Sequence, residues 1–167
     1  MRYAGINKND FASAPGTCVT VYLQGCDKHC KGCHNPETWD FCGGKEFTND
    51  TLDEIIQALT TNTVARDLCI MGGEPLHAEN SFLTYMIIDM VLRALPNTKI
   101  YLWTGYYLDE LKLLPGWIRI KQILERCEML VDGPYEEENR DITLFMRGST
   151  NQTIYNKEQL LDFINKL

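Results

Sequence analysis

The chain has 167 residues with 44% apolar and 23% charged side chains, which is ordinary for a globular protein and predicts a single domain over residues 1–167. Its formal net charge of −7 disfavours nucleic acid as a partner, because the chain has no excess of Lys and Arg to displace counterions from phosphates. The most apolar stretch, residues 82–95, contains Asp89 and Arg93, and residues 1–11 have no apolar signal-peptide core. We therefore expect a cytoplasmic protein with no membrane partner.

The chain alternates strand-like and helix-like segments. Residues 17–25 are β-branched and aromatic and end in glycine, which predicts a buried strand. Residues 47–59 predict a helix, with Thr48, Asn49 and Asp50 as capping candidates. The remaining predictions are strands at 67–73, 99–105 and 128–134, helices at 81–95, 106–114, 118–125 and 157–167, and a late hairpin formed by 143–149 and 152–156.

This alternation predicts an α/β fold with parallel strands and right-handed crossovers. Four or five units are too few for a closed eight-stranded barrel, so we expect an incomplete βα barrel or an open, mostly parallel sheet. Ligands collect at the carboxyl ends of such strands. The segments that follow the predicted strands are therefore expected on one rim: residues 26–33, 72–75, 104–106 and 132–135.

Three cysteines, Cys26, Cys30 and Cys33, lie within eight residues directly after the first predicted strand. A zinc site would need a fourth ligand, for which His29, His34 and Cys42 are candidates. A disulfide is disfavoured in a reducing compartment. A [4Fe–4S] cluster held by three thiolates would keep one iron open to a small molecule. Spacing alone leaves zinc and the cluster as alternatives.

The spacing Cys26-x3-Cys30-x2-Cys33 resembles the signature of the radical S-adenosylmethionine enzymes, and "GGEP" at residues 72–75 resembles their second motif. The resemblance implies a partial barrel of that type, a [4Fe–4S] cluster on the three cysteines, and S-adenosylmethionine on the open iron. The residues implied in binding S-adenosylmethionine are Gly32, Cys33, His34, Gly72, Gly73 and Glu74, with Thr104 and Asp132 as weaker candidates near the ribose. For Thr104 the alternative is a cap, and for Asp132 a turn residue.

Five segments together resemble a narrower group, the activating proteins of anaerobic ribonucleoside-triphosphate reductase. They are residues 25–39, 72–77, 103–111, 130–135 and 147–152. Gly32 also fits that group, since many other radical S-adenosylmethionine enzymes have an aromatic residue there. The resemblance implies an oxidoreductase that cleaves S-adenosylmethionine reductively and generates a glycyl radical on the large subunit of the reductase, with an electron donor such as a flavodoxin.

Two other functions remain as alternatives at this point. One is an activase of another glycyl-radical enzyme, of the formate-lyase type. The other is a non-catalytic zinc-binding interaction module. Arg147 and Asn151 lie in the last motif and are expected either to brace the site or a partner, or to belong to a surface hairpin. His29 and His34 lie in the cysteine loop, and the sequence leaves open whether they contact the cluster, the cofactor or neither.

Overall fold

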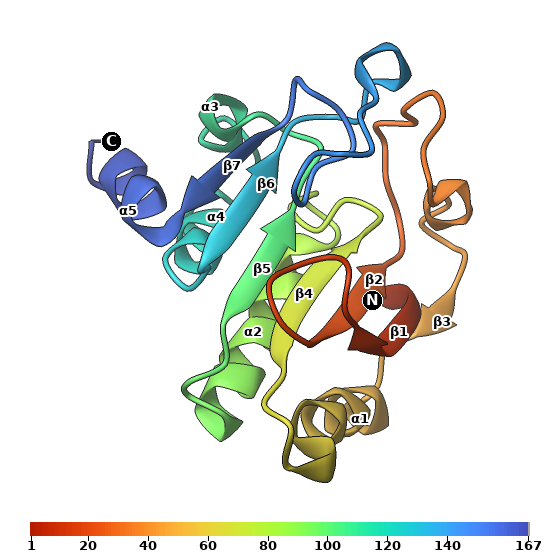
Figure 1. The fold of residues 1–167 in the computed structure, drawn as a ribbon, viewed down its shortest axis with the longest axis vertical. Helices are drawn as coiled ribbons and strands as arrows, with labels where there is room; N and C mark the ends of the chain where they lie inside the picture. The colour runs from red at the N-terminus through yellow and green to blue at the C-terminus, as the bar shows by residue number, and fades with distance from the viewer. Residues whose placement is uncertain (167) are drawn as a thin grey trace.

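The computed structural model describes residues 1–166, which form a seven-stranded sheet with helices packed against one face (Figure 1). The strand order is β3-β1-β2-β4-β5-β6-β7. The strands are β1 (Arg2–Asp10), β2 (Cys18–Leu23), β3 (Lys45–Glu46), β4 (Asp67–Gly72), β5 (Ile100–Trp103), β6 (Met129–Asp132) and β7 (Thr153–Asn156). The helices are α1 (Asn49–Thr60), α2 (Ser81–Ala94), α3 (Leu108–Leu111), α4 (Trp117–Leu124) and α5 (Lys157–Asn165), with short 3-10 turns at Pro36–Thr38, Thr61–Thr63 and Glu137–Asn139.

The four central strands β2, β4, β5 and β6 pair in parallel, with helical crossovers between them. β1 and β7 flank them in antiparallel pairings, and β3 pairs antiparallel with β1, so β3 runs in the same direction as β2. The sheet ends at β3 on one side and at β7 on the other. The predicted α/β class with an open, mostly parallel sheet is therefore confirmed.

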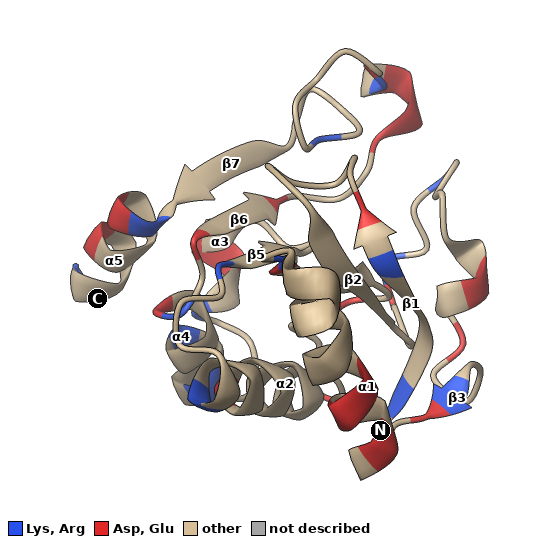
Figure 2. Cartoon of the chain, turned by 60° about the horizontal axis from the view of Figure 1, so that its bottom comes forward, with Lys and Arg blue, Asp and Glu red and all other residues tan. Residues whose placement is uncertain are grey.

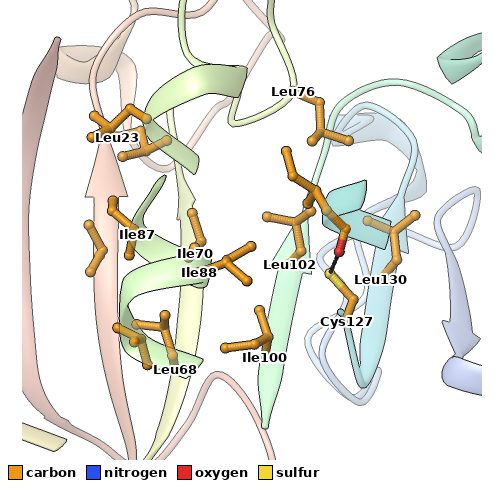
Figure 3. Close-up of a cluster of buried hydrophobic side chains, with 14 of the residues drawn as sticks. Leu23, Leu68, Ile70, Leu76, Ile87, Ile88, Ile100, Leu102, Cys127 and Leu130 are labelled. Atoms are coloured by element: carbon orange, nitrogen blue, oxygen red, sulfur yellow. Dashed lines mark hydrogen bonds between the residues drawn. The ribbon is translucent and has the colours of Figure 1, made fainter. Parts of the chain in front are cut away.

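The helices cover one face of the sheet because their apolar residues recur at helical spacing. In α1, Thr48 accepts a hydrogen bond from the Thr51 backbone N–H as the N-cap, and the helix buries Leu52, Ile55 and Leu59. Side chains from all five helices share one core with the inward-facing residues of the strands. Figure 3 shows the part of this core that contains Leu23, Leu68, Ile70, Ile88, Ile100 and Leu102.

Alternate strand residues point to the opposite face of the sheet, as the twofold period of a strand requires. A second, smaller core there consists of Ala14, Cys18, Cys69 and Tyr101. The loop after β1, which supplies Ala14, crosses in front of β4 and covers this face (Figure 1). Partly buried Met71, Trp103, Met129 and Met146 pack against the same cluster. This face therefore has a lining that is largely apolar.

Charged residues lie mainly on the helices and loops, with both signs interspersed (Figure 2). No helix within residues 1–166 is long and apolar enough to cross a bilayer.

Two parts of the strand prediction are wrong. β1 and β3 were not predicted, and the late hairpin does not form. Residues 143–149 contain no strand, because Met146 has a positive φ of 58°, which breaks an extended backbone. β7 instead pairs antiparallel with β6, where it completes the edge of the sheet, and the loop retains only an isolated bridge between Arg140 and Ser149. Residue 167 of the predicted last helix lies outside the described residues.

Candidate active site

A pocket of about 220 Å³ lies at the carboxyl ends of the parallel strands. It is built from the ends of β4 and β5 and from the segments that follow β2, β4, β5 and β6. The last of these segments is the long loop between β6 and β7. The lining residues are Cys26, Lys28, Cys30, Cys33, His34, Asn35, Met71, Gly72, Gly73, Glu74, Trp103, Thr104, Gly105, Gly133, Tyr135, Met146, Gly148 and Gln152. The expected convergence of these segments on one rim is confirmed.

The three cysteines of the loop after β2 line this pocket together, each partly exposed. Burial raises the pKa of the Cys26 thiol to about 11 and also raises the pKa of Cys30. Backbone N–H groups oppose this shift: those of Lys28 and His29 donate to Cys26, and that of Tyr135 donates to Cys30. The Asn35 N–H lies 3.4 Å from the Cys33 sulfur.

These donors fit an iron–sulfur cluster. Backbone hydrogen bonds to thiolate sulfur are one of the means by which proteins stabilise a cluster and tune its potential. No group of three or more His, Cys, Asp or Glu side chains within residues 1–166 is arranged around the position of a single metal ion.

The cysteine loop turns back on itself through left-handed backbone at His29 (φ 46°) and Gly32 (φ 73°). The His29 ring stacks on Trp39, with 4.7 Å between the ring centroids. A Cβ on Gly32 would lie 2.9 Å from Glu137 Oε1, so the loop after β6 occupies the space beside this residue. The same loop brings Tyr135 to 5.4 Å from the His34 ring. The left-handed backbone at Gly32 favours glycine, whereas the neighbouring Glu137 side chain is flexible and could shift.

Glu74 is buried, with 1% of its surface exposed, and both carboxylate oxygens are held by the protein. Oε1 accepts hydrogen bonds from the Thr104 hydroxyl at 2.7 Å and the Leu76 N–H at 3.0 Å, while Oε2 accepts from the Gly105 N–H at 2.6 Å. Burial nevertheless raises the pKa of Glu74 to about 7. The nearby Lys28 ammonium, 3.6 Å from the centroid of the Tyr106 ring, opposes that rise.

The opposite wall of the pocket is apolar, and it was not singled out from the sequence. Trp103 donates its indole N–H to the Met146 carbonyl at 2.9 Å, which joins β5 to the loop between β6 and β7. Met71 and Trp103 alternate with the core residues Ile70 and Leu102 along their strands. That alternation was the available signal, because it directs one set of side chains to the face away from the helices.

Asp132 lies outside the pocket lining. Its Oδ2 accepts from the Leu108 N–H at 2.8 Å and its Oδ1 from the Thr153 N–H at 3.1 Å, so it joins the ends of α3 and β7. Thr104 does line the pocket, with its hydroxyl committed to Glu74.

Arg147 and Asn151 both brace the loop between β6 and β7. Arg147 Nη1 donates to the Gln152 carbonyl at 3.0 Å, and Asn151 Nδ2 donates to the Pro134 carbonyl at 2.8 Å.

A family model described as a 4Fe-4S single cluster domain matches residues 12–155. The anaerobic ribonucleoside-triphosphate reductase-activating protein of Pasteurella multocida is 35% identical over 93% of this chain and 97% of its own length. The chain belongs to this family of activating proteins. The proteins of the same name from Escherichia coli K12 and Enterobacteria phage T4 are 33% and 32% identical, over 98% and 94% of their lengths and 93% of this chain.

Membership of the activating-protein family decides between the two readings of the cysteine spacing. The matched family model describes a 4Fe–4S cluster, and it spans the cysteine loop and every other segment of the pocket. The zinc-binding module is correspondingly disfavoured. The names of the relatives specify the anaerobic reductase, which disfavours an activase of the formate-lyase type.

Proposed function

We propose that this protein binds a [4Fe–4S] cluster and S-adenosylmethionine in the pocket and generates a glycyl radical on anaerobic ribonucleoside-triphosphate reductase. The observation that carries the proposal is that Cys26, Cys30, Cys33 and Glu74 line one cavity. Three thiolates would leave one iron of a cubic cluster without a protein ligand, and the buried Glu74 carboxylate lines the same cavity, where it would receive a cation.

Together the bound cluster and S-adenosylmethionine supply a one-electron cleavage of the sulfonium, which yields a 5′-deoxyadenosyl radical able to take hydrogen from a glycine. The protein's part is to bind and orient. Glu74 receives the methionine ammonium, and its bonds to Thr104 and Gly105 fix its direction. Gly72 and Gly73 let the backbone approach the ligand.

The remaining predicted residues have roles in the proposal that range from direct contact with S-adenosylmethionine to support of the surrounding backbone. Gly32, Cys33 and His34 contact the nucleoside end of S-adenosylmethionine. Thr104 lines the same cavity, where its oxygen would accept a hydrogen bond from the ribose while its hydroxyl continues to donate to Glu74. Asp132 contributes through the Leu108 and Thr153 backbone groups that it holds.

The proposal extends to the architecture and setting. The open sheet corresponds to the partial barrel of radical S-adenosylmethionine enzymes, in one domain, and its two unclosed edges leave room for a segment of the reductase. The proposal also includes a flavodoxin-type protein as the electron donor and a cytoplasmic location.

Anaerobic reconstitution with iron and sulfide tests the cluster. About four irons and four sulfides per chain are expected, whereas one tightly held zinc with no iron would support the interaction module instead. The reconstituted protein is then incubated with S-adenosylmethionine, a reductant and either the anaerobic reductase or a formate-lyase-type enzyme. A glycyl-radical doublet in the electron paramagnetic resonance spectrum is expected with the reductase. Its absence there, or its appearance only with the other enzyme, refutes the assigned target.

A further inference from the structure

Asn80 stands at the N-cap of α2, yet its side chain makes no capping hydrogen bond. An N-cap asparagine ordinarily accepts a hydrogen bond from a backbone N–H of the first helical turn. Here the amide turns away from the helix and is buried, with 4% of the residue exposed. Its Nδ2 donates to the Gly25 carbonyl and to the Glu74 carbonyl, at 3.0 Å in each case.

The two carbonyls belong to two of the loops that build the pocket. Gly25 directly precedes Cys26, the first of the three cysteines, and Glu74 is the buried carboxylate. The Gly25 carbonyl also accepts from the Glu74 N–H at 2.8 Å. The loops approach so closely here that a Cβ on Gly73 would overlap the Gly25 carbonyl oxygen. A single amide thus ties both loops to the start of α2.

We infer that Asn80 is a positioning residue that sets the spacing between the cysteine loop and Glu74. The inference rests on the proposed function, because that spacing matters for a ligand that the cluster and Glu74 would hold jointly. A displacement of about 1 Å between binding groups is enough to reduce catalysis on the order of 100-fold. Two hydrogen bonds from one planar amide restrict such displacement in a way that the Gly25–Glu74 backbone contact alone does not.

The substitution Asn80→Ser separates this role from helix capping. Serine is also a favoured N-cap residue and brings no charge, but its side chain is too short to bridge the two carbonyls. Asn156→Ser is the matched control, because Asn156 caps α5 in the ordinary way, accepting from the Gln159 N–H at 2.9 Å, and lies outside the pocket lining.

The first measurement uses the reconstituted protein. For Asn80→Ser we expect the iron content of the unmodified protein, with a dissociation constant for S-adenosylmethionine raised about 10- to 100-fold. Asn156→Ser should match the unmodified protein in its iron content and in its dissociation constant for S-adenosylmethionine. An unchanged dissociation constant for Asn80→Ser, or iron loss as complete as in Cys30→Ala, overturns the inference.

The second measurement is hydrogen exchange on the cluster-free protein, so it does not depend on the proposed function. In Asn80→Ser, the Glu74 amide that donates to Gly25 should exchange faster while the amides of α2 keep their protection. Faster exchange throughout α2 would show a capping role and overturn the inference. If the unmodified protein itself fails to bind S-adenosylmethionine, the proposed function is refuted, and the exchange result still decides whether Asn80 joins the two loops.

Discussion

The Thr104 hydroxyl donates to Glu74 Oε1 at 2.7 Å and thereby joins the end of β5 to the loop that follows β4. The Leu76 and Gly105 N–H groups complete the set of donors around this carboxylate. These bonds favour the charged form, but burial opposes it more strongly, and the pKa of Glu74 rises from 4.5 to about 7. The residue proposed to hold an ammonium therefore changes charge close to neutral pH.

This pKa shift makes stability depend on pH. Between pH 4.5 and about 7 the folded protein keeps a proton on Glu74 that the unfolded chain has lost. The contribution of Glu74 to the free energy of unfolding should therefore fall as pH rises through that window, by on the order of 3 kcal/mol in all. Above the window this contribution should stay level. Urea unfolding of Glu74→Gln between pH 4.5 and 8 should lack this decline. A decline of equal size in the variant would contradict the assignment to Glu74.

Thr104→Val removes a donor that lowers the pKa of Glu74. The carboxyl should then stay protonated to higher pH, which weakens its attraction for an ammonium at pH 7. We expect S-adenosylmethionine to bind roughly 10-fold more weakly at pH 7, as befits a lost hydrogen bond to a charged group, with partial recovery at pH 8.5. Titration calorimetry at pH 7 and pH 8.5 measures the dissociation constant for S-adenosylmethionine. An equal loss of affinity at both pH values would indicate lost packing instead of a changed pKa.

Cys30→Ala should abolish the cluster, because its sulfur lines the pocket with Cys26 and Cys33. Cys42→Ala is the control, since Cys42 is exposed and lies outside the lining. After anaerobic reconstitution we expect at most a small residue of iron in Cys30→Ala and about four irons per chain in the control. Loss of iron in both variants would instead make Cys42 a ligand.

Gly73→Ala should destabilise the protein, because the added Cβ overlaps the Gly25 carbonyl, which is backbone and cannot move aside cheaply. We expect a loss of about 2 kcal/mol or more in the free energy of unfolding. Gly5→Ala in β1 is matched in chemistry but meets nothing within 4 Å, so its effect should stay within about 1 kcal/mol. Chemical denaturation of both variants compares them, and similar losses would show that overlap at Gly73 is not the cause.

The central part of the fold was predictable from the sequence because its signals are local. Helix α1 follows from the apolar spacing of its residues, and strands β2 and β4 follow from their short apolar runs, each bounded by glycine soon after its last apolar residue. The rim of the pocket followed in turn, since parallel strands bring their carboxyl ends to one edge.

The elements that were missed depend on distant partners. β1 was missed because it carries a polar sequence whose strand conformation comes from pairing with β2. The strand of β7 was predicted, but its partner was not, because β7 pairs with β6 rather than with residues 143–149. The same holds in the site. The motif residues were visible, but the roles of Asn80 and Asp132 depend on carbonyl and N–H groups 55 and 24 residues away. No periodicity within one segment reports such contacts.

The burial of the other cysteines has a consequence for how the protein matures. Of the seven cysteines, Cys18, Cys69 and Cys127 are completely inaccessible in the folded chain, while those of the loop after β2 and Cys42 reach the surface to some degree. Folding thus separates three buried thiols from the four that an iron donor could reach. An unfolded chain would offer all seven sulfurs to an iron donor, so a sheet that has already assembled narrows the choice to the thiols near the pocket and Cys42.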